Sequence, residues 1–395
     1  MKTVLIVTSG FPLFKKEGIN EFMLEFADSM AKEFNVLVLA PYSKGSKRYE
    51  EWGNLKIYRH NQFPFVNAEL AYGNGIVNNI KKNPFLVFSI PFFFLLQILA
   101  IKKIVSLHKV DVIHAHWIIP QGVSSILYKK IFEKKIKIIA TIHGSDFLDL
   151  NNWFFKKLKN WCLFNVDQIT VVGAHIKEQI EKQQLKIPPV ILAPMGISTI
   201  KFSPEKRDRK LHEELQIKGE FLLFVGNCIP EKGISELVLS MPNIIKAFPS
   251  AVLVVIGQGV LLEQLQTMAK QLGVAANIRF MGALASEKLP GYFASADAFI
   301  LPSYSEGYSL VVREALSSET PVIVSDIETF NSGELSNLVF KLKKIEPNDI
   351  AEMVKSVLKG NDKLEEMKKK GRIYVQQNDD VSTVHRIYFH LVKSL

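Results

Sequence analysis

The sequence predicts an α/β protein made of two similar halves, each built on a parallel sheet. At the start, an apolar strand at residues 4–8 is followed by a helical pattern at 21–33 and a second strand at 36–40. A new series with the same character begins at residues 221–226, an apolar run that ends in glycine. With 395 residues, the chain has room for two domains of ordinary size.

Composition and charge narrow the class of protein. Hydrophobic residues make up 48% and charged residues 22%, which is typical of folded domains. The net charge of +10 fits an anionic partner such as a nucleotide or an acidic membrane, or simply a solvated basic surface. No RNA-binding or zinc-finger signature occurs, so we expect no nucleic acid partner. Cys162 and Cys228 have no metal or redox spacing and are expected to be buried and reduced. Residues 3–8 lack a following cleavage site, so we expect a strand there and a cytoplasmic protein.

The first half continues after a loop at residues 9–20 that contains Gly18. Further strands are expected at 110–115, 136–142, 168–172 and 191–197, and a polar linker at about 196–216. Two of these strands run into histidine, in HAHWIIPQG at residues 114–122 and in HGSDF at 143–147. His114 and His116 share one side of a strand, as metal ligands can, but no third ligand follows and no metal is expected.

Residues 84–101 form an uncharged apolar stretch flanked by lysines. Its length is borderline for a membrane-spanning helix, and Pro91 and Gln97 interrupt it. Spanning would also separate strands of one sheet. Contact in the plane of an anionic membrane is a second interpretation, and a helix packed on the sheet is the one we favour.

The second half supplies strands at 252–257, 278–282, 298–301 and 322–326, a helix at 234–248 and a final amphipathic helix at 381–395. Ligands of open α/β sheets bind outside the carboxyl ends of the strands. The residues expected there are Gly18, His116 and His143 in the first half, and 226–233, 257–259, 281–284 and 303–309 in the second.

The stretch LPSYSEGYSLVVREAL, at residues 301–316, holds a loop and a helix start. Ser309 is placed to cap the helix. Glu306 and Glu314 lie on either side of a helix N-terminus whose free amides attract phosphate, which suits a phosphorylated, hydroxyl-rich ligand. The spacing alone does not separate a catalytic acid/base pair from a binding role. Lys232, in PEKG before the next helix, could neutralise a pyrophosphate or be an ordinary surface lysine.

The order of these motifs resembles that of retaining family 4 glycosyltransferases. SEGYSLVVREA resembles their two-glutamate motif, GNCIPEKG their diphosphate loop and TIHGSDF their donor-side histidine. APMGI followed by Phe202 resembles their interdomain strand, and GFPLFKKEGI their N-terminal loop. The resemblance implies a GT-B fold: two Rossmann-like domains, at residues 1–196 and 197–375, face each other across a cleft. A helix from about 376 to 395 crosses back to the first domain.

The resemblance also implies roles for individual residues. Lys232, Glu306 and His143 would act on the leaving diphosphate and the transferring sugar, Glu314 would bind the ribose, and Gly18 and His116 would lie on the acceptor side. The remaining donor-binding residues would be Gly226, Asn227, Gly233, Gly282, Leu284, Gly307, Tyr308, Ser309 and Leu310. Asn227 stands where the family usually has arginine, and Ser309 where it often has glycine.

The expected reaction is metal-independent transfer of a hexose or N-acetylhexosamine from a UDP- or GDP-linked sugar to a hydroxyl, with no further cofactor. The acceptor would be a lipid-linked or surface-polysaccharide glycan, reached at the cytoplasmic face of an anionic membrane. Two alternatives stay open: a nucleotide-sugar 2-epimerase of the same fold, and a catalytically silent subunit that binds a sugar nucleotide.

Overall fold

The computed structural model describes residues 1–15, 20–63, 70–71, 75–148, 152–360 and 364–395. They form two compact units, Met1–Met195 with Val384–Leu395 and Gly196–Thr383. Helix α15 (Leu364–Asn378) belongs to the second unit, and α16 (Val381–Ser394) joins the first unit from Val384 onward. The domain limits expected from the sequence were 1–196 and 197–375, with the last helix starting at about 376.

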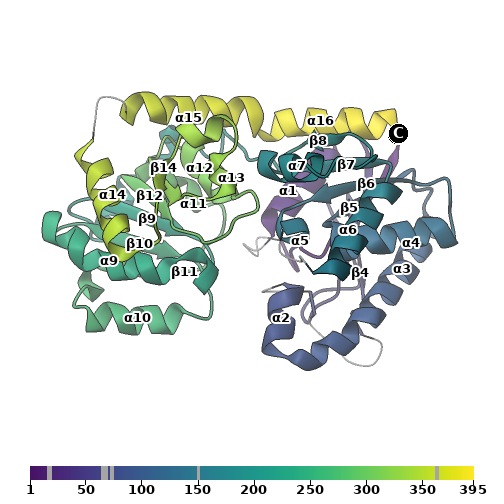
Figure 1. The fold of residues 1–395 in the computed structure, drawn as a ribbon, viewed down its shortest axis with the longest axis horizontal. Helices are drawn as coiled ribbons and strands as arrows, with labels where there is room; N and C mark the ends of the chain where they lie inside the picture. Colours follow the sequence, from purple (N-terminus) through teal and green to yellow (C-terminus); the bar gives the residue numbers. More distant parts are fainter. Residues whose placement is uncertain (16–19, 64–69, 72–74, 149–151, 361–363) are drawn as a thin grey trace. The chain divides into compact units, whose positions relative to one another are not determined.

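The first unit is built on an eight-stranded sheet with the order β3-β4-β2-β1-β5-β6-β7-β8 (Figure 1). Its strands are β1 (Thr3–Val7), β2 (Asn35–Pro41), β3 (Tyr49–Trp52), β4 (Leu55–His60), β5 (Val112–His116), β6 (Lys137–Ile142), β7 (Gln168–Val171) and β8 (Val190–Leu192). Every pair is parallel except β3 with β4. Strands β1 and β5 are buried along their whole length, as central strands of a covered parallel sheet are.

The helices of the first unit connect these strands. They are α1 (Glu21–Met30), α2 (Ile76–Lys82), η1 (Pro84–Ser89), α3 (Ile90–Leu107), η2 (Ile118–Gly122), α4 (Val123–Ile131), α5 (Ser145–Leu148), α6 (Trp153–Asn165) and α7 (Ala174–Glu181). The short hairpin of β3 and β4 and helix α2 were not expected from the sequence.

The second unit has a six-stranded, wholly parallel sheet with the order β11-β10-β9-β12-β13-β14. Its strands are β9 (Phe221–Val225), β10 (Val252–Ile256), β11 (Ile278–Gly282), β12 (Ala298–Leu301), β13 (Val322–Ser325) and β14 (Phe340–Leu342). The connecting elements are η3 (Pro204–Lys206), α8 (Lys210–Glu214), η4 (Pro230–Lys232), α9 (Ile234–Ala247), α10 (Leu262–Gln271), η5 (Ala275–Asn277), α11 (Leu289–Ser295), α12 (Leu310–Ser317), α13 (Glu328–Asn331), η6 (Glu334–Asn337) and α14 (Pro347–Lys359). The parallel α/β architecture expected for both halves is thus confirmed.

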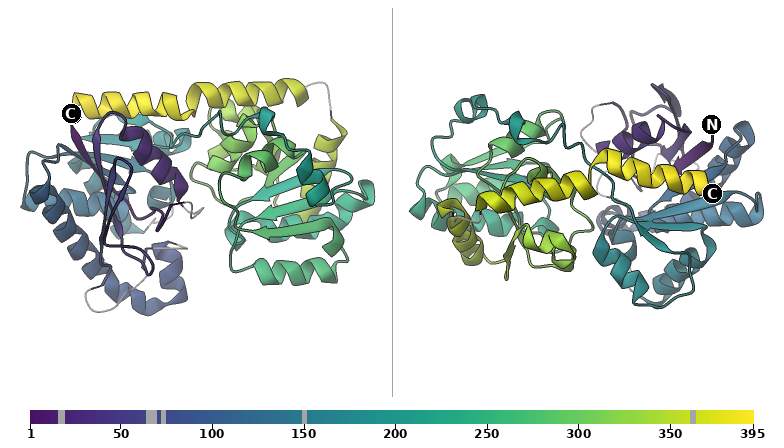
Figure 2. Two further views of the ribbon diagram at one scale, coloured as in Figure 1. Left: turned by 180° about the vertical axis from the view of Figure 1, so that it is seen from behind. Right: turned by 90° about the horizontal axis from the view of Figure 1, so that it is seen from above.

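Helix α16 completes the core of the first unit. Val384, Tyr388 and Val392 are at most 2% exposed. The Tyr388 hydroxyl donates to the carbonyl of Ala193 at 3.2 Å. The Lys2 ammonium donates to the carbonyl of Val392 at 2.9 Å, so the two ends of the chain lie side by side (Figure 2).

Two expectations from the sequence are wrong in part. The stretch expected as a polar linker, about 196–216, contains η3 and α8 and buries Phe202 and Leu211 in the second core. The apolar segment expected to pack on the sheet is buried on one side only. Pro84–Leu107 is long and apolar enough to cross a membrane, and only 22% of its most hydrophobic window is buried. One face of a helix suffices to contact β4 and α4, which leaves the other uncovered.

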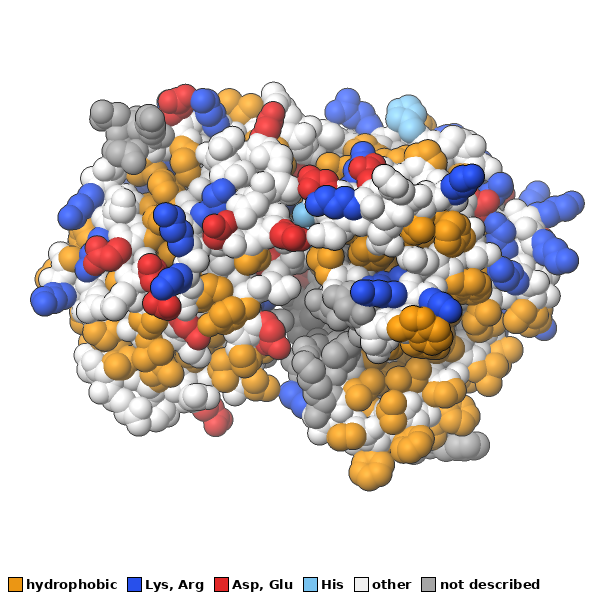
Figure 3. Space-filling model, in the orientation of Figure 1, with side chains coloured by type: hydrophobic (Ala, Val, Ile, Leu, Met, Phe, Trp, Pro, Cys, Tyr) orange, Lys and Arg blue, Asp and Glu red, His pale blue; other side chains and the backbone are white. Residues whose placement is uncertain are grey.

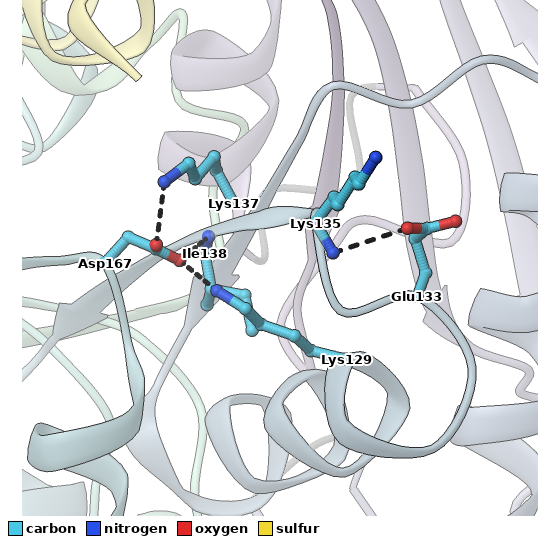
Figure 4. Close-up of polar contacts among 6 residues, drawn as sticks. All are labelled: Lys129, Glu133, Lys135, Lys137, Ile138 and Asp167. Atoms are coloured by element: carbon cyan, nitrogen blue, oxygen red, sulfur yellow. Dashed lines mark hydrogen bonds and ion pairs between the residues drawn. The ribbon is translucent and has the colours of Figure 1, made fainter.

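Asp167, the residue before β7, joins helix α4 and strand β6 of the first unit (Figure 4). Its carboxylate accepts from the Lys129 ammonium of α4 at 2.6 Å, from the Lys137 ammonium at 3.3 Å and from the Ile138 amide of β6 at 2.9 Å. Burial opposes ionisation of this group, but the hydrogen bonds from Lys129 and Ile138 outweigh it and lower the pKa of Asp167.

Replacing Asp167 with asparagine should therefore destabilise the first unit by about 1–2 kcal/mol, because charge-assisted hydrogen bonds are lost. The matched control is Glu133→Gln. The carboxylate of Glu133 is exposed and accepts a 3.3 Å hydrogen bond from the Lys135 amide (Figure 4). Urea unfolding at pH 7 measures both variants. Equal midpoints for D167N and the wild type would contradict this account.

Candidate functional site

The carboxyl edge of the second sheet carries a connected set of loops. From β9 the chain proceeds to β10 and β11 in one direction, and from β12 to β13 and β14 in the other. The order of strands therefore reverses between β9 and β12, which is where open parallel sheets bind ligands. Lys232 follows β9 and Glu306 follows β12, so the two lie on either side of this reversal.

Glycines let the loops of this edge approach each other closely. Gly257 has φ 145°, and a Cβ there would lie 1.8 Å from the Gly226 carbonyl oxygen. A Cβ on Gly233, at φ 61°, would lie 2.0 Å from the carbonyl oxygen of Pro302. Main-chain bonds join the same loops, since Gly226 N donates to Ile256 O at 3.0 Å. Larger residues at 233 and 257 would push these loops apart.

Lys232 and Glu306 form a direct ion pair. The Lys232 ammonium lies 2.6 Å from Glu306 Oε1, and the side chains are 23% and 7% exposed. Ser303 Oγ donates to the same carboxylate oxygen at 2.7 Å, and Thr329 Oγ1 donates to the Glu306 carbonyl at 2.5 Å. Glu306 is thus held in place, and the Lys232 side chain stays partly exposed, where an anion could reach it.

The turn before α12 differs from the expectation for Ser309. This residue does not cap the helix, because its side chain makes no capping hydrogen bond and its main chain has φ 62°. Its hydroxyl oxygen is buried without a partner among the described residues. Positive φ favours glycine, so the local capping rule is overridden by the conformation of the turn.

Arg313, which was not predicted from the sequence as a site residue, contacts this turn from within the second unit. The residue is 4% exposed, and its guanidinium donates to the carbonyls of Tyr308 and Ser309 and lies 3.9 Å from the centre of the Tyr308 ring. Its Nε is 3.5 Å from the buried carboxylate of Asp379. Burial raises the pKa of Asp379, and the charge of Arg313 acts in the opposite direction. The buried contacts of Arg313 with Tyr308, Ser309 and Asp379 thus hold the turn at residues 307–309 in place.

The other predicted residues of the second unit lie along the same edge. Gly226 and exposed Asn227 follow β9, and Gly233 precedes α9. Gly282 ends β11 and is joined to the neighbouring loop by the Gly257 amide at 2.8 Å, with Leu284 two residues further on. Tyr308 is 7% exposed. Leu310 is the first residue of α12, and Glu314 lies in that helix. Gly307 is part of the turn before it.

In the first unit, His116 and His143 meet at the ends of β5 and β6, while Gly18 lies outside the described residues. His116 Nδ1 and His143 Nε2 are 3.1 Å apart. His114 Nε2 contacts Thr141 Oγ1 at 2.7 Å, so this histidine belongs to a buried hydrogen-bond network. Within the part of the chain that the structure describes, no three His, Cys, Asp or Glu side chains are grouped to hold a metal.

Two further residues shape the His143 loop and were missed in the sequence. The Trp117 ring stacks on His143 with centroids 4.3 Å apart. Asp146 is 6% exposed and accepts from the amides of Ile118, His143 and Gly144 at 2.7, 3.1 and 3.0 Å. Burial raises the pKa of Asp146 to about 6, although these amides favour the carboxylate. The position of Asp146 in the HGSDF motif could have indicated this role, because aspartate in a turn often accepts hydrogen bonds from the amides of its own turn.

The histidine cluster makes acid sensitivity an expected property of the first unit. Burial lowers the pKa of His114 and of His143 to about 3 each, and that of His116 well below its usual range. In the unfolded chain these groups bind protons below about pH 6.5, so the free energy of unfolding falls as pH drops, by about 1.4 kcal/mol per pH unit for each histidine. The Asp146 carboxyl has the opposite effect between about pH 4 and 6, because its raised pKa increases the free energy of unfolding as pH drops. Three histidines oppose this one carboxyl, so the net effect of acid on the cluster is destabilising.

Urea midpoints should therefore be lower at pH 5 than at pH 7. A His116→Asn variant should show a shallower pH dependence by about one proton. A urea midpoint that is unchanged or higher at pH 5 would contradict the prediction that these three histidines are uncharged in the folded protein.

Replacing Ser309 with glycine should raise stability by about 1 kcal/mol, because it relieves a left-handed non-glycine residue and removes a buried unpaired hydroxyl. The melting temperature of the second unit should rise by about 2–4 °C. Ser332→Gly is the matched control, since Ser332 has φ −89° and glycine should destabilise there. A lower melting temperature for S309G would contradict the strain at this turn.

Comparison with known proteins identifies the family. Residues 17–200 match the family model "Glycosyltransferase Family 4", and residues 207–374 match "Glycosyl transferases group 1". The two segments leave out only residues 1–16, 201–206 and 375–395.

Individual relatives agree with the family models. The chain is 23% identical over 333 residues to the GDP-mannose-dependent alpha-(1-6)-phosphatidylinositol monomannoside mannosyltransferase of Mycolicibacterium smegmatis, covering 81% of this chain and 79% of that one. Sucrose-phosphate synthase of Thermosynechococcus elongatus superposes with a TM-score of 0.79 at 16% identity, over 100% and 99% of the two chains. Anabaena HepE in complex with UDP superposes with a TM-score of 0.71 at 14% identity, over the whole of both chains. The protein is therefore a glycosyltransferase of family 4 with the GT-B fold.

Proposed function

We propose that this protein is a retaining, metal-independent glycosyltransferase that moves a hexosyl or N-acetylhexosaminyl group from a nucleotide diphosphate sugar to a hydroxyl. The observation that carries the proposal is the Lys232–Glu306 pair, 2.6 Å apart at the strand reversal of the second sheet. A cation and a hydrogen-bond acceptor stand there side by side. They match the two halves of the donor, an anionic diphosphate and a sugar rich in hydroxyls.

The diphosphate is the part of the donor on which negative charge develops as the glycosidic bond breaks. A positioned ammonium stabilises that charge, and such preorganised electrostatic contacts supply a large share of enzymatic rate enhancement. Lys232 stands directly before Gly233, the N-cap of the 14-residue helix α9, whose first amides carry partial positive charge. Lys232 and the helix amides are therefore the groups we assign to the leaving diphosphate.

The two glutamates suit hydroxyl recognition better than acid/base chemistry. Glu306 already accepts hydrogen bonds from Lys232 and Ser303, and a carboxylate also accepts hydrogen bonds from sugar hydroxyls. Glu314 lies further along α12 and would bind the ribose. Exposed Asn227 is neutral where the family usually has arginine, so Lys232 would carry more of the stabilisation of the diphosphate.

The donor and acceptor are proposed from the relatives. One relative is named as GDP-mannose-dependent and another was solved with UDP, which supports a UDP- or GDP-linked sugar. The mycobacterial relative is named for a phosphatidylinositol monomannoside, which supports a lipid-linked or polysaccharide acceptor. Burial of both free thiols, Cys162 and Cys228, is consistent with a cytoplasmic protein.

Nucleotide release tests the proposal without a known acceptor. UDP- and GDP-sugars are first screened by thermal shift, and slow hydrolysis of the stabilising donor is then followed as release of nucleotide diphosphate. Lys232→Ala should lower that release by about a hundredfold or more, and Lys232→Arg should restore part of it. With an acceptor, NMR of the product should show the donor's anomeric configuration.

The matched control is Lys218→Ala, which removes an exposed lysine before β9, at the opposite edge of the same sheet. Melting temperatures separate a chemical defect from unfolding, because K232A leaves Glu306 without its counterion. Release by K232A at the wild-type rate, with donor bound, would refute the role of Lys232. Isomerisation of the sugar without any acceptor would instead identify an epimerase.

A further inference from the structure

An exposed apolar surface lies on η1 and α3 of the first unit, and none of its residues is assigned to the transfer reaction. Its members are large hydrophobic side chains that are between 38% and 79% exposed: Phe85, Val87, Phe88, Phe92, Leu95 and Leu99. We call this set the α3 surface. In Figure 3 hydrophobic side chains gather over the region where Figure 1 draws α2 and α3. Contiguous exposure of this kind marks an interaction site rather than scattered surface residues.

The α3 surface is one face of a helix that is fixed by its other face. Phe93, Ile101 and Ile104 are at most 2% exposed. Gln97 is fully buried, and its Nε2 lies 3.3 Å from Nε2 of His60, the last residue of β4. The exposed residues 92, 95 and 99 recur at helical spacing on the opposite side. The helix is therefore anchored, and its outward apolar face is a stable feature of the folded unit.

Because α3 is anchored in the fold, it can contact a membrane in only one way. The strands before and after this segment, β4 and β5, belong to one sheet. A helix that crossed a bilayer would place them on opposite sides of it, so the segment can only lie on the surface. Exposed Phe85, Phe88 and Phe92 at its N-terminal end are suited to the lipid–water interface, where amphipathic segments bury their apolar face to a depth of about 5–10 Å.

The charged side chains of the segment that carries the α3 surface are all of one sign. The sequence has no Asp or Glu between Glu69 and Asp111, but it has five lysines there. Lys82, Lys102 and Lys103 are exposed, and Lys102 extends over the Phe132 ring at 4.5 Å. Such a border complements anionic lipid headgroups. A second copy of the chain would bring lysines against lysines across a two-fold axis, which disfavours a dimer through this face.

We propose that the α3 surface docks the first unit onto an anionic bilayer, with Phe85, Phe88, Phe92, Leu95 and Leu99 in the interface and the flanking lysines on the headgroups. Membrane binding is independent of the transfer reaction. Its use, to meet a lipid-linked acceptor where that lipid resides, rests on the proposed function.

Cosedimentation of the full chain with vesicles tests the proposal. The vesicles are pure phosphatidylcholine, or phosphatidylcholine with about 30 mol% phosphatidylglycerol. The wild type should bind the anionic vesicles, and less so as salt rises from about 0.1 to 0.5 M. F85S/F88S/L95S should lower the affinity at least tenfold. K82Q/K102Q/K103Q should lower it by roughly fivefold for each lysine that reaches the headgroups.

Two matched controls remove equivalent groups from the second unit. L239S/V260S/I373S takes away exposed apolar side chains, and K218Q/K343Q/K359Q takes away exposed lysines. Both should bind vesicles like the wild type. All variants should keep the thermal shift produced by UDP or GDP, which reports the donor site separately.

Three outcomes would overturn the proposal. One is absence of wild-type binding to anionic vesicles, and another is undiminished binding by F85S/F88S/L95S. The third is a wild-type dimer in analytical ultracentrifugation that the same triple substitution converts to monomer, which would assign the surface to a second copy. Vesicle binding together with no donor cleavage by the wild type would refute the proposed function and leave the membrane surface intact.

Discussion

The candidate site depends on parallel strand pairing. Every crossover in the second unit returns the chain to the same edge of the sheet, so all six strands end on one side. That constraint brings Lys232 and Glu306, which are 74 residues apart in sequence, to 2.6 Å. Gly233 and Gly257 then let the loops touch through their main chains. The position of the ion pair is thus a property of the sheet, and the loops only refine it.

This dependence explains how much of the site the sequence predicts. Strand ends can be located from apolar runs, and chemically suitable residues beside them, such as Lys232 and Glu306, become candidates. The Arg313–Asp379 contact joins residues far apart in the chain, and no local pattern identifies it. Ser309 shows the consequence. From the neighbouring residues alone, Ser309 is predicted to cap α12. In the structure Arg313 donates to the Ser309 carbonyl, and Ser309 has a left-handed conformation and makes no capping hydrogen bond.

For the fold as well, the sequence predicted the class of architecture but not every element or its burial. Long apolar strands and their alternation with helices determine the parallel α/β class, and this prediction is confirmed. Hydropathy cannot tell whether a neighbour covers a helix, so the segment of η1 and α3 was expected to pack on the sheet although Phe88 of η1 is 69% exposed. The β3–β4 hairpin was missed because its strands are short and partly polar, and their pairing is set by the sheet edge they join.

Helix α16 has a consequence for biosynthesis. Tyr388 and Val392 fill the core of a unit whose other residues end at Met195. While the ribosome synthesises the second unit, the first lacks these side chains, and the groups that contact Tyr388 stay open to water. At bacterial to eukaryotic rates of about 5–20 residues per second, this interval lasts roughly 10–40 s. The N-terminal unit is therefore the first to begin folding and the last to be finished, and a chaperone would find its open core throughout that time.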